Sequence, residues 1–412
     1  MEYVCLDIPE ARDKVIANKG SAGSDGMSVF ELPMFLEVHG ENIKQKLRDG
    51  RYIPSPVRRV DIPKPNGGTR MLGIPTALDR TIQQAIAMEL ELEFEPQFSE
   101  HSYGFRPGRS AQMAVRQAQS YIKEGYRWVV EIDLSKFFDR VNHDILMNRI
   151  ARVIDDKPLL KLIRRYLNAG IMEDGLVKPR TEGVPQGSPL SPLLSNIMLT
   201  ELDWELEKRG LKFCRYADDC NIFVKSEVAA KRALENITRY LEEVLKLRVN
   251  RDKSGTFRPC DSVFLGYTFS KGNFSSPVVA EKSLKRLAAK LRGIFHSARG
   301  TSLQATIKRL TQILRGWRNY FDLDTRKEFF ERLDLLIHRH LRKLVWLAWK
   351  KPRTRRREFL KRGISPETAR KAASSGKGAW RNARTPVMHM VIPIKLLVHL
   401  GLYSLSRKAI CW

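Results

Sequence analysis

The chain has 412 residues and 42% of them are hydrophobic, so it can bury a large core and is long enough for roughly two or three domains. Its 73 Lys and Arg against 46 Asp and Glu give a formal net charge of +27. An excess of that size points to a polyanionic partner and favours nucleic acid over a membrane surface.

Segments for membrane insertion or secretion are not visible in the sequence. No apolar run approaches the roughly 20 residues that span a bilayer, and the first residues, Met1-Glu2-Tyr3-Val4, do not resemble a signal peptide. The five cysteines are scattered, which excludes a disulfide framework and a Cys-x-x-Cys zinc site. We therefore expect a cytoplasmic protein that is associated with nucleic acid and not with a membrane.

Residues 1 to about 50 are predicted to be helical, with a glycine-rich break at residues 19–26. Three glycines in this short stretch mark a loop that can approach another backbone closely. Taken alone, such a loop is a linker.

Two alternating strands follow within residues 56–75, on either side of an Asn-Gly-Gly turn, and they predict a β-hairpin. Lys64 and Arg70 bracket the turn, so both side chains could point the same way. A triphosphate needs such cations to balance its charge. A solvated basic hairpin is the alternative. The next segment, residues 78–95, has apolar residues at helical spacing and is predicted to be a core helix.

Three carboxylates follow strand-like segments. An apolar strand runs into Asp133, and strand formers flank the adjacent pair Asp218 and Asp219, which predicts a tight hairpin over residues 213–224. Two neighbouring anions repel and cost stability unless a cation binds there, and oxygen ligands suit Mg²⁺. Carboxylates on two strands can hold two metal ions about 4 Å apart for in-line attack on a phosphate. An ordinary surface turn is the alternative for the pair taken alone.

The C-terminal third is predicted to be helical and basic. Composition shifts after about residue 275, and residues 281–349 read as helices whose polar faces carry Lys and Arg. Trp317, Tyr320 and Phe321 are expected in the core of this bundle. The dense basic run 350–357 is either a solvated linker or a phosphate-binding segment, and beside such helices the second reading is favoured.

These motifs resemble those of a known family. Tyr216–Asp219 on a hairpin, with Asp133 and Phe137–Asp139 upstream, resembles the catalytic pair of a reverse transcriptase. The run Gly183–Ile197 is similar to the template-contacting motif of the same family. Leu314–Phe321 resembles the signature of the maturase-specific domain, which forms the thumb.

From about residue 19 to about residue 404, the chain resembles the maturase-reverse transcriptases of bacterial group II introns, of the class C kind that lacks an endonuclease. The resemblance implies an α+β right-hand polymerase, with fingers and palm built on antiparallel sheet, a helical thumb and a small basic C-terminal region. The implied parts are an N-terminal extension with a template loop, the fingers and palm, the thumb or maturase-specific domain, and a DNA-binding region, at residues 1–50, 51–275, 276–349 and 350–412.

The resemblance also implies roles for single residues. The implied catalytic residues are Asp133, Asp218 and Asp219. The implied cofactors are two Mg²⁺ ions, with ligands at Asp133, Leu134, Asp218 and Asp219. Residues expected to bind the incoming dNTP or the template are Lys64, Arg70, Arg58, Pro185, Gln186 and Gly187. Phe138 is expected beneath the sugar, where it leaves no room for a 2′-hydroxyl, while Phe137 faces the core.

The implied function is RNA-directed DNA polymerisation, in which dNTPs are added to a primer 3′-hydroxyl on an RNA template. The protein would also bind its group II intron RNA as a maturase, to promote splicing and retrohoming into target DNA. One alternative is a splicing cofactor that no longer polymerises, but the intact carboxylates argue against it. The other is a reverse transcriptase of another bacterial retroelement, such as a retron, a diversity-generating element or a CRISPR locus. The thumb signature and the basic tail argue against that one.

Overall fold

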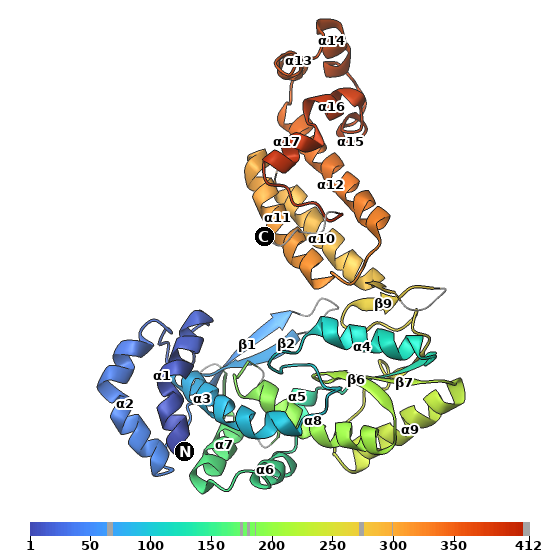
Figure 1. Cartoon of the computed structure of the whole chain (residues 1–412). Coiled ribbons are helices and arrows are strands. Elements are labelled where there is room, and N and C mark those ends of the chain that lie inside the picture. The colour runs from blue at the N-terminus through green and yellow to red at the C-terminus, as the bar shows by residue number, and fades with distance from the viewer. Residues whose placement is uncertain are drawn as a thin grey trace. The chain divides into compact units, whose positions relative to one another are not determined.

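The computed structural model describes residues 1–63, 69–173, 176–178, 182–185, 187–271, 276–298 and 300–406 (Figure 1). The chain forms two compact units, Met1–Ser262 and Val263–Trp412. Both four-stranded sheets lie in the first unit. Within the described ranges, no helix is long and apolar enough to cross a membrane. The domain boundaries at residues 50, 275 and 349 remain predictions.

The first unit begins with helices that pack beside a mixed sheet. The helices are α1 (Glu2–Ala17), α2 (Leu32–Arg48) and α3 (Ala77–Phe94). The sheet has the order β2-β1-β4-β5, with β1 (Val57–Pro63), β2 (Thr69–Ile74), β4 (Ile171–Glu173) and β5 (Leu176–Lys178). As predicted, β1 and β2 form an antiparallel hairpin. The predicted core helix is α3, whose N-cap Thr76 accepts a hydrogen bond from the Asp79 amide and whose side chains at Ile82, Ile86 and Leu90 are fully buried.

The second sheet is antiparallel and has helices on both faces. Its order is β6-β7-β3-β8, with β3 (Trp128–Ile132), β6 (Lys212–Tyr216), β7 (Asp219–Val224) and β8 (Gly255–Phe257). The helices of this part are α4 (Ala111–Lys123), α5 (Phe137–Arg140), α6 (His143–Ala151), α7 (Lys157–Asn168), α8 (Ser191–Lys208) and α9 (Glu227–Glu243), with the 3₁₀ turn η1 (Glu95–Gln97). Successive side chains of β7 point to opposite faces. Phe223 therefore meets Tyr121 of α4, at 5.5 Å between ring centroids, whereas Ile222 joins the core that includes Ile237 of α9 (Figure 1).

A fully buried ion pair ties this sheet to α8. Arg215 of β6 donates from Nε to Oδ1 of Asp203 at 2.7 Å and from Nη2 to Oδ2 at 2.6 Å, and both side chains have 0% exposure. Its Nη1 also donates to Oδ1 of Asn196 at 3.0 Å and to the carbonyl of Ala217 at 2.9 Å. A charge can be buried in this way because its counter-ion and its hydrogen-bond acceptors are buried with it.

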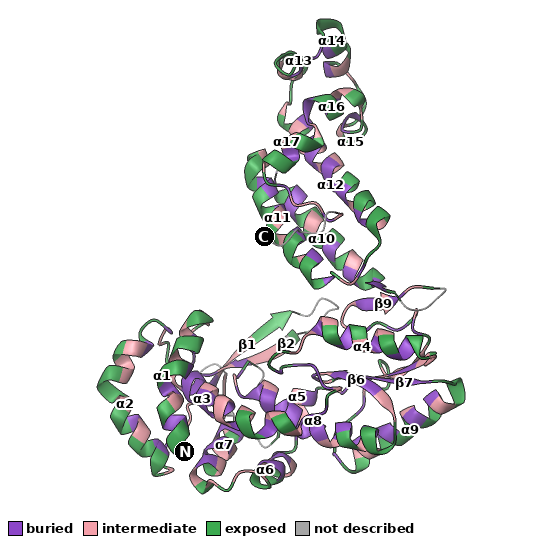
Figure 2. Ribbon diagram, viewed as in Figure 1, coloured by how far each residue is buried: buried purple, intermediate pink, exposed green. Residues whose placement is uncertain are grey.

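The second unit is a helical bundle preceded by a short hairpin. The hairpin is formed by β9 (Tyr267–Phe269) and β10 (Pro277–Val279). The helices are α10 (Glu281–Ser297), α11 (Leu303–Tyr320), α12 (Lys327–Ala348), α13 (Pro352–Leu360), α14 (Pro366–Ala373), α15 (Ala379–Asn382), α16 (Pro386–Val391) and α17 (Ile394–His399). Their buried faces meet in one apolar core, visible in purple in Figure 2, which includes Leu310, Leu314, Phe330 and Leu341.

One expectation for the second unit is corrected. Phe321 is buried and Trp317 is half-buried as expected, but Tyr320 is 39% exposed. Its ring stacks on Tyr267 with centroids 6.2 Å apart, and its hydroxyl donates to the Leu265 carbonyl at 3.0 Å. The side chain therefore makes its contacts at the surface of the unit and not in the core.

The basic run at residues 350–357 is not a linker, because most of it forms α13. Arg355 belongs to the packing of this helix. Its Nε donates to the Trp349 carbonyl at 2.9 Å, and its guanidinium lies 4.2 Å from the Trp346 ring centroid. The other charged side chains of the run are exposed, namely those of Lys350, Lys351, Arg353, Arg356 and Arg357.

Replacing Asp203 by Asn should lower the free energy of unfolding of the first unit by about 3–5 kcal/mol, because Arg215 would remain buried without a counter-ion. The matched control is Glu227→Gln, which removes the partner of Lys231 in a pair whose side chains are 48% and 68% exposed. That change should cost less than about 1 kcal/mol. Urea unfolding followed by circular dichroism measures both variants. Equal unfolding midpoints would show that the buried pair contributes no more than the exposed one.

Candidate active site

A strained two-residue turn joins β6 to β7 and carries the adjacent carboxylates. Tyr216 pairs with Asp219 across the hairpin, so Ala217 and Asp218 form its tip. Ala217 has a φ of 57°, a left-handed conformation that is costly for a residue with a side chain. The hydrogen bond from Arg215 to the Ala217 carbonyl holds the turn in this conformation from beneath.

Gly104 packs directly on the same turn. A Cβ at this position would lie 2.3 Å from the Ala217 backbone nitrogen, so only glycine fits without a backbone shift. The Gly104 carbonyl accepts a hydrogen bond of 2.9 Å from Nδ2 of Asn196, the same amide whose oxygen binds Arg215. The turn is thus held by one buried network and one close backbone contact.

Asp133 follows β3, the strand next to β7. Ile132 pairs with Cys220, so the chain continues from Ile132 to Asp133 beside Asp219, the first residue of β7. Segment 250–254 binds Asp133 from the other side. The Asn250 amide donates to Oδ1 at 3.0 Å, Nζ of Lys253 lies 3.3 Å from Oδ2, and the Asp133 amide donates to Oγ of Ser254 at 3.0 Å. Leu134 is buried and bridges to Val249.

Loss of water and nearby negative charge together make the Asp219 carboxylate harder to ionise. The pKa of Asp219 is raised to about 6, first because protein surrounds its carboxylate and removes water, and then because Asp218, Asp133 and Glu131 add negative charge. The residue still reaches solvent at the surface. Lys253 acts in the opposite direction and lowers the pKa. Asp133, Asp218 and Asp219 therefore share one electrostatic environment, although they come from two different strands.

The chemistry of this cluster suits a hard divalent cation. Its donors are carboxylate oxygens, which Mg²⁺ prefers, and the charged ammonium of Lys253 already lies against one of them. Within the described ranges, however, no three His, Cys, Asp or Glu side chains are arranged closely enough to hold a metal ion by themselves. The cluster therefore fits an ion that takes further ligands from water or from a substrate phosphate.

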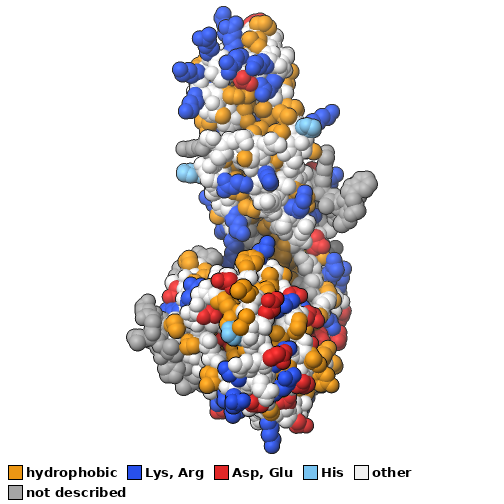
Figure 3. Space-filling model, turned by 90° about the vertical axis from the view of Figure 1, so that its left-hand side faces the viewer, with side chains coloured by type: hydrophobic (Ala, Val, Ile, Leu, Met, Phe, Trp, Pro, Cys, Tyr) orange, Lys and Arg blue, Asp and Glu red, His pale blue; other side chains and the backbone are white. Residues whose placement is uncertain are grey.

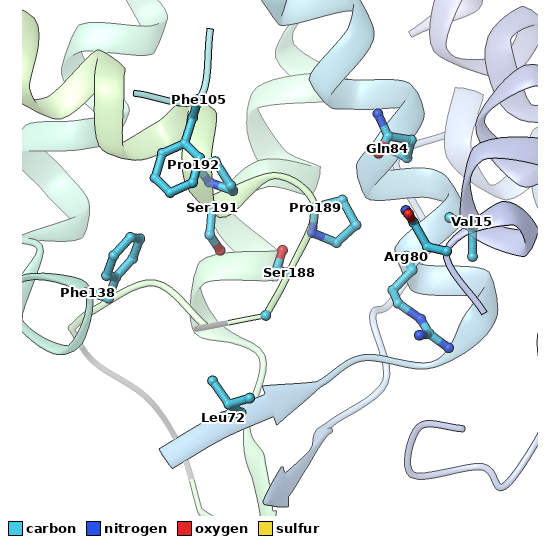
Figure 4. Close-up of a pocket in the computed structure, with 12 residues that line it drawn as sticks. Val15, Leu72, Arg80, Gln84, Phe105, Phe138, Ser188, Pro189, Ser191 and Pro192 are labelled. Carbon is cyan, nitrogen blue, oxygen red and sulfur yellow. The ribbon is translucent and has the colours of Figure 1, made fainter. Parts of the chain in front are cut away.

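A cavity of about 430 Å³ lies among β2, α3, α5 and α8, and its lining includes Phe138 and Leu72 (Figure 4). Phe137 is buried in the core, as expected, whereas the half-buried ring of Phe138 reaches the cavity. The rings meet edge to face with centroids 5.3 Å apart. Gly183 fixes the position of this segment, since a Cβ there would lie 2.8 Å from the Phe138 carbonyl oxygen.

Of the other residues predicted to bind substrate, some are described by the structure and some are not. Pro185 is buried, and Gly187 lines the cavity with a φ of 104°. Arg58 donates from Nε and Nη2 to the Ala22 carbonyl at 3.1 and 2.8 Å, so it binds the glycine-rich loop. Arg70 lies opposite Ile62 in the hairpin, but its side chain is outside the described part of the chain, as are Lys64 and Gln186.

Some residues of the site were not predicted from the sequence. The network beneath the turn depends on Arg215 of β6 with Asp203 and Asn196 of α8, which only the packing of the strand on the helix brings together. The partners of Asp133 had a signal in the sequence. The polar segment Asn-x-x-Lys-Ser at residues 250–254 follows a strand-like segment, as Asp133 does, and could have been assigned to the same site.

Comparisons with known proteins match two parts of the chain to known families. Residues 62–269 match the family described as reverse transcriptase (RNA-dependent DNA polymerase), and residues 284–363 match the group II intron, maturase-specific domain. Protein YkfC of Escherichia coli (strain K12) is 37% identical over 301 residues, which cover 63% of this chain and 79% of YkfC. The group II intron-encoded protein LtrA of Lactococcus lactis subsp. cremoris is 40% identical over 206 residues, which cover 50% of this chain and 34% of LtrA. A solved Cas6-RT-Cas1–Cas2 complex is similar over 57% of this chain and 41% of its own, with 27% identity and a TM-score of 0.35, too low to compare folds.

Removing one charge from the cluster should stabilise the fold in a pH-dependent way. Because the folded pKa of Asp219 is about 6 and its ordinary value is 3.8, ionisation of Asp219 destabilises the fold as the pH rises through this window. Asp219→Asn should therefore raise the Tm more at about pH 7.5 than at about pH 5, in buffer without divalent cations. Asp261→Asn, which removes an exposed carboxylate, should show no such difference. The same gain at both pH values would contradict the raised pKa.

Proposed function

Because this chain belongs to the reverse transcriptase family and carries a group II intron maturase-specific domain, we propose that Asp133, Asp218 and Asp219 are its catalytic residues. The family catalyses RNA-directed DNA polymerisation and generally uses divalent metal ions. The observation that carries the proposal is that Asp133 follows β3 beside Asp219 of β7, and that Asp218 and Asp133 both contribute to the raised pKa of Asp219.

Two Mg²⁺ ions are the proposed cofactors, with ligands at Asp133, Asp218, Asp219 and Leu134. When bound, such ions supply electrostatic stabilisation for the transfer of a nucleotide to the primer 3′-hydroxyl. The chain's own contribution is to hold mutually repelling carboxylates together. Arg215 fixes the turn that carries Asp218, and Asn250 orients Asp133. Nζ of Lys253 lies 3.3 Å from Oδ2 of Asp133, so its positive charge partly neutralises this carboxylate.

Substrate selection is proposed to rest on the cavity and on the hairpin of β1 and β2. Phe138 lines the cavity, where its ring would exclude a 2′-hydroxyl and favour dNTPs. Lys64 and Arg70 are the proposed ligands of the triphosphate, with Arg58 assisting through the glycine-rich loop, to which it is bonded. Pro185, Gln186 and Gly187 are the proposed contacts to the template.

Nucleic acid is the class of partner that the maturase-specific domain and the net charge of +27 indicate. We propose group II intron RNA, a template–primer duplex and target DNA as the specific partners, and a cytoplasmic location. The proposed DNA-binding region, residues 350–412, carries the exposed Arg353, Arg356 and Arg357 on α13. Blue side chains are also dense over the second unit in Figure 3.

Asp218→Asn should lower the rate of primer extension by several orders of magnitude, because it removes one charged ligand of the proposed metal site. Single-turnover extension of a DNA primer on an RNA template, with saturating duplex, measures this rate. Affinity for the same duplex should persist in a filter-binding assay, since the basic surfaces are unchanged. Asp261→Asn is the control for loss of an exposed charge. Near wild-type extension by Asp218→Asn would refute the assignment of the active site.

Phe138→Ala should raise the efficiency of rNTP use relative to dNTP use, because the smaller side chain leaves room for a 2′-hydroxyl in the cavity. Single-nucleotide incorporation with each kind of substrate gives the ratio of the two kcat/KM values. Phe137→Ala is the matched control, and it should destabilise the core without changing this ratio. If only Phe137→Ala changes the ratio, the two rings have been assigned the wrong way round.

A further inference from the structure

Phe105 is an aromatic residue that is held in a strained backbone conformation at the cavity. Its φ of 58° lies in the left-handed region, which is a genuine outlier for a bulky side chain. Burial of the ring does not compensate for this strain, since the residue is 50% exposed. Such strain costs stability and clusters at functional sites, so an exposed ring that is kept in this conformation indicates a function for the ring.

The residues on either side fix the backbone of Phe105. Gly104 packs directly against the backbone nitrogen of Ala217. Arg106 is buried, and its Nη1 donates to the Ser102 carbonyl at 2.9 Å. Phe105 therefore cannot relax without moving either this arginine or the turn that carries the proposed catalytic carboxylates.

The ring lines the cavity beside the same turn. Its centroid lies 6.5 Å from that of Tyr216, which directly precedes the tip that carries Asp218. In Figure 4, the rings of Phe105 and Phe138 lie on the same side of the cavity, opposite Arg80. Because Phe138 is the proposed contact of the incoming sugar, a ring beside the turn faces the nucleotide that carries the primer 3′-hydroxyl.

The chemistry of this ring suits contact with a base pair of any sequence. A phenyl ring has no hydrogen-bond donor or acceptor, so it cannot read the polar patterns by which base pairs differ. It can contact the edge and the sugars of a pair only through their shape. Watson–Crick pairs share one outline, whereas a mismatched pair does not. A polymerase that copies every sequence can therefore use such a ring to test the pair without restricting the sequence.

We propose that Phe105 packs against the base pair at the primer terminus and makes extension depend on the shape of that pair. This inference rests on the proposed polymerase function. A mismatch displaces the edge of the pair and loses the contact, so a primer that ends in a mismatch is extended more slowly. The alternative is a ring that only packs on Tyr216, which would contribute to stability and not to selectivity.

The test combines Phe105→Asn with primers whose last base is either matched or mismatched to the template. Asparagine tolerates the left-handed conformation and lacks the ring, so the variant should keep at least the wild-type Tm. The ratio of the matched to the mismatched single-turnover extension rate should fall about five-fold, the effect of losing about 40 Å² of apolar contact.

Two further variants separate the ring from the backbone. Phe105→Tyr keeps the ring and should recover most of the ratio. The matched control is Lys246→Asn, which relaxes an exposed residue with a φ of 55° beyond the end of α9. It should keep the wild-type ratio, because only the backbone strain changes.

Each other outcome overturns the proposal. If Phe105→Asn fails to fold, or loses Tm and keeps the ratio, the ring is structural. An unchanged ratio at the wild-type Tm means that the ring does not contact the pair. A higher KM for dNTP with an unchanged ratio assigns the ring to the incoming nucleotide. Normal wild-type extension in the same samples, with an unchanged ratio for the variant, refutes this contact alone, whereas near wild-type extension by Asp218→Asn refutes the proposed function.

Discussion

The site depends on the buried pair of Arg215 and Asp203. Without it, the turn that carries Asp218 would have to keep a left-handed alanine against the repulsion of neighbouring carboxylates. The guanidinium binds the turn, α8 and Asn196 at once, so it converts a surface hairpin into part of the core. Double hydrogen bonding to Asp203 fixes its orientation as well as its charge, which a lysine could not do.

The rigid structure beneath the carboxylates holds them together although they repel one another. The pKa of Asp219 is raised first because protein removes water from its carboxylate, and then because Asp218 and Asp133 are held near it. Strain of this kind persists where the surrounding fold over-determines the local conformation. Here Gly104 does so from one side and the network from below. The stability lost at the site is offset by apolar packing of the sheet, both faces of which are covered by helices.

Much of the fold and part of the site could be predicted from the sequence. The comparisons confirm the predicted family, the polymerase fold and RNA-directed DNA polymerase activity. These were predictable because the motifs around Asp133 and Asp218 are local and specific. The hairpin of β1 and β2 was predictable from its turn residues. The role of Arg215 was not, because it depends on how β6 packs on Asp203 and Asn196 of α8, which no sequence pattern reveals. The exposure of Tyr320 was missed because helical spacing alone cannot reveal a stacking partner such as Tyr267.

The close approach of Gly104 to Ala217 links two segments that are more than a hundred residues apart in the chain. Neither segment can drift independently in evolution, since any side chain at position 104 would push on the backbone that presents the carboxylates. Attempts to retune the polymerase by random mutagenesis would therefore find little freedom at this point. Useful diversity is better sought around the cavity, where side chains and not backbones meet, and where a changed side chain would leave the geometry of the turn intact.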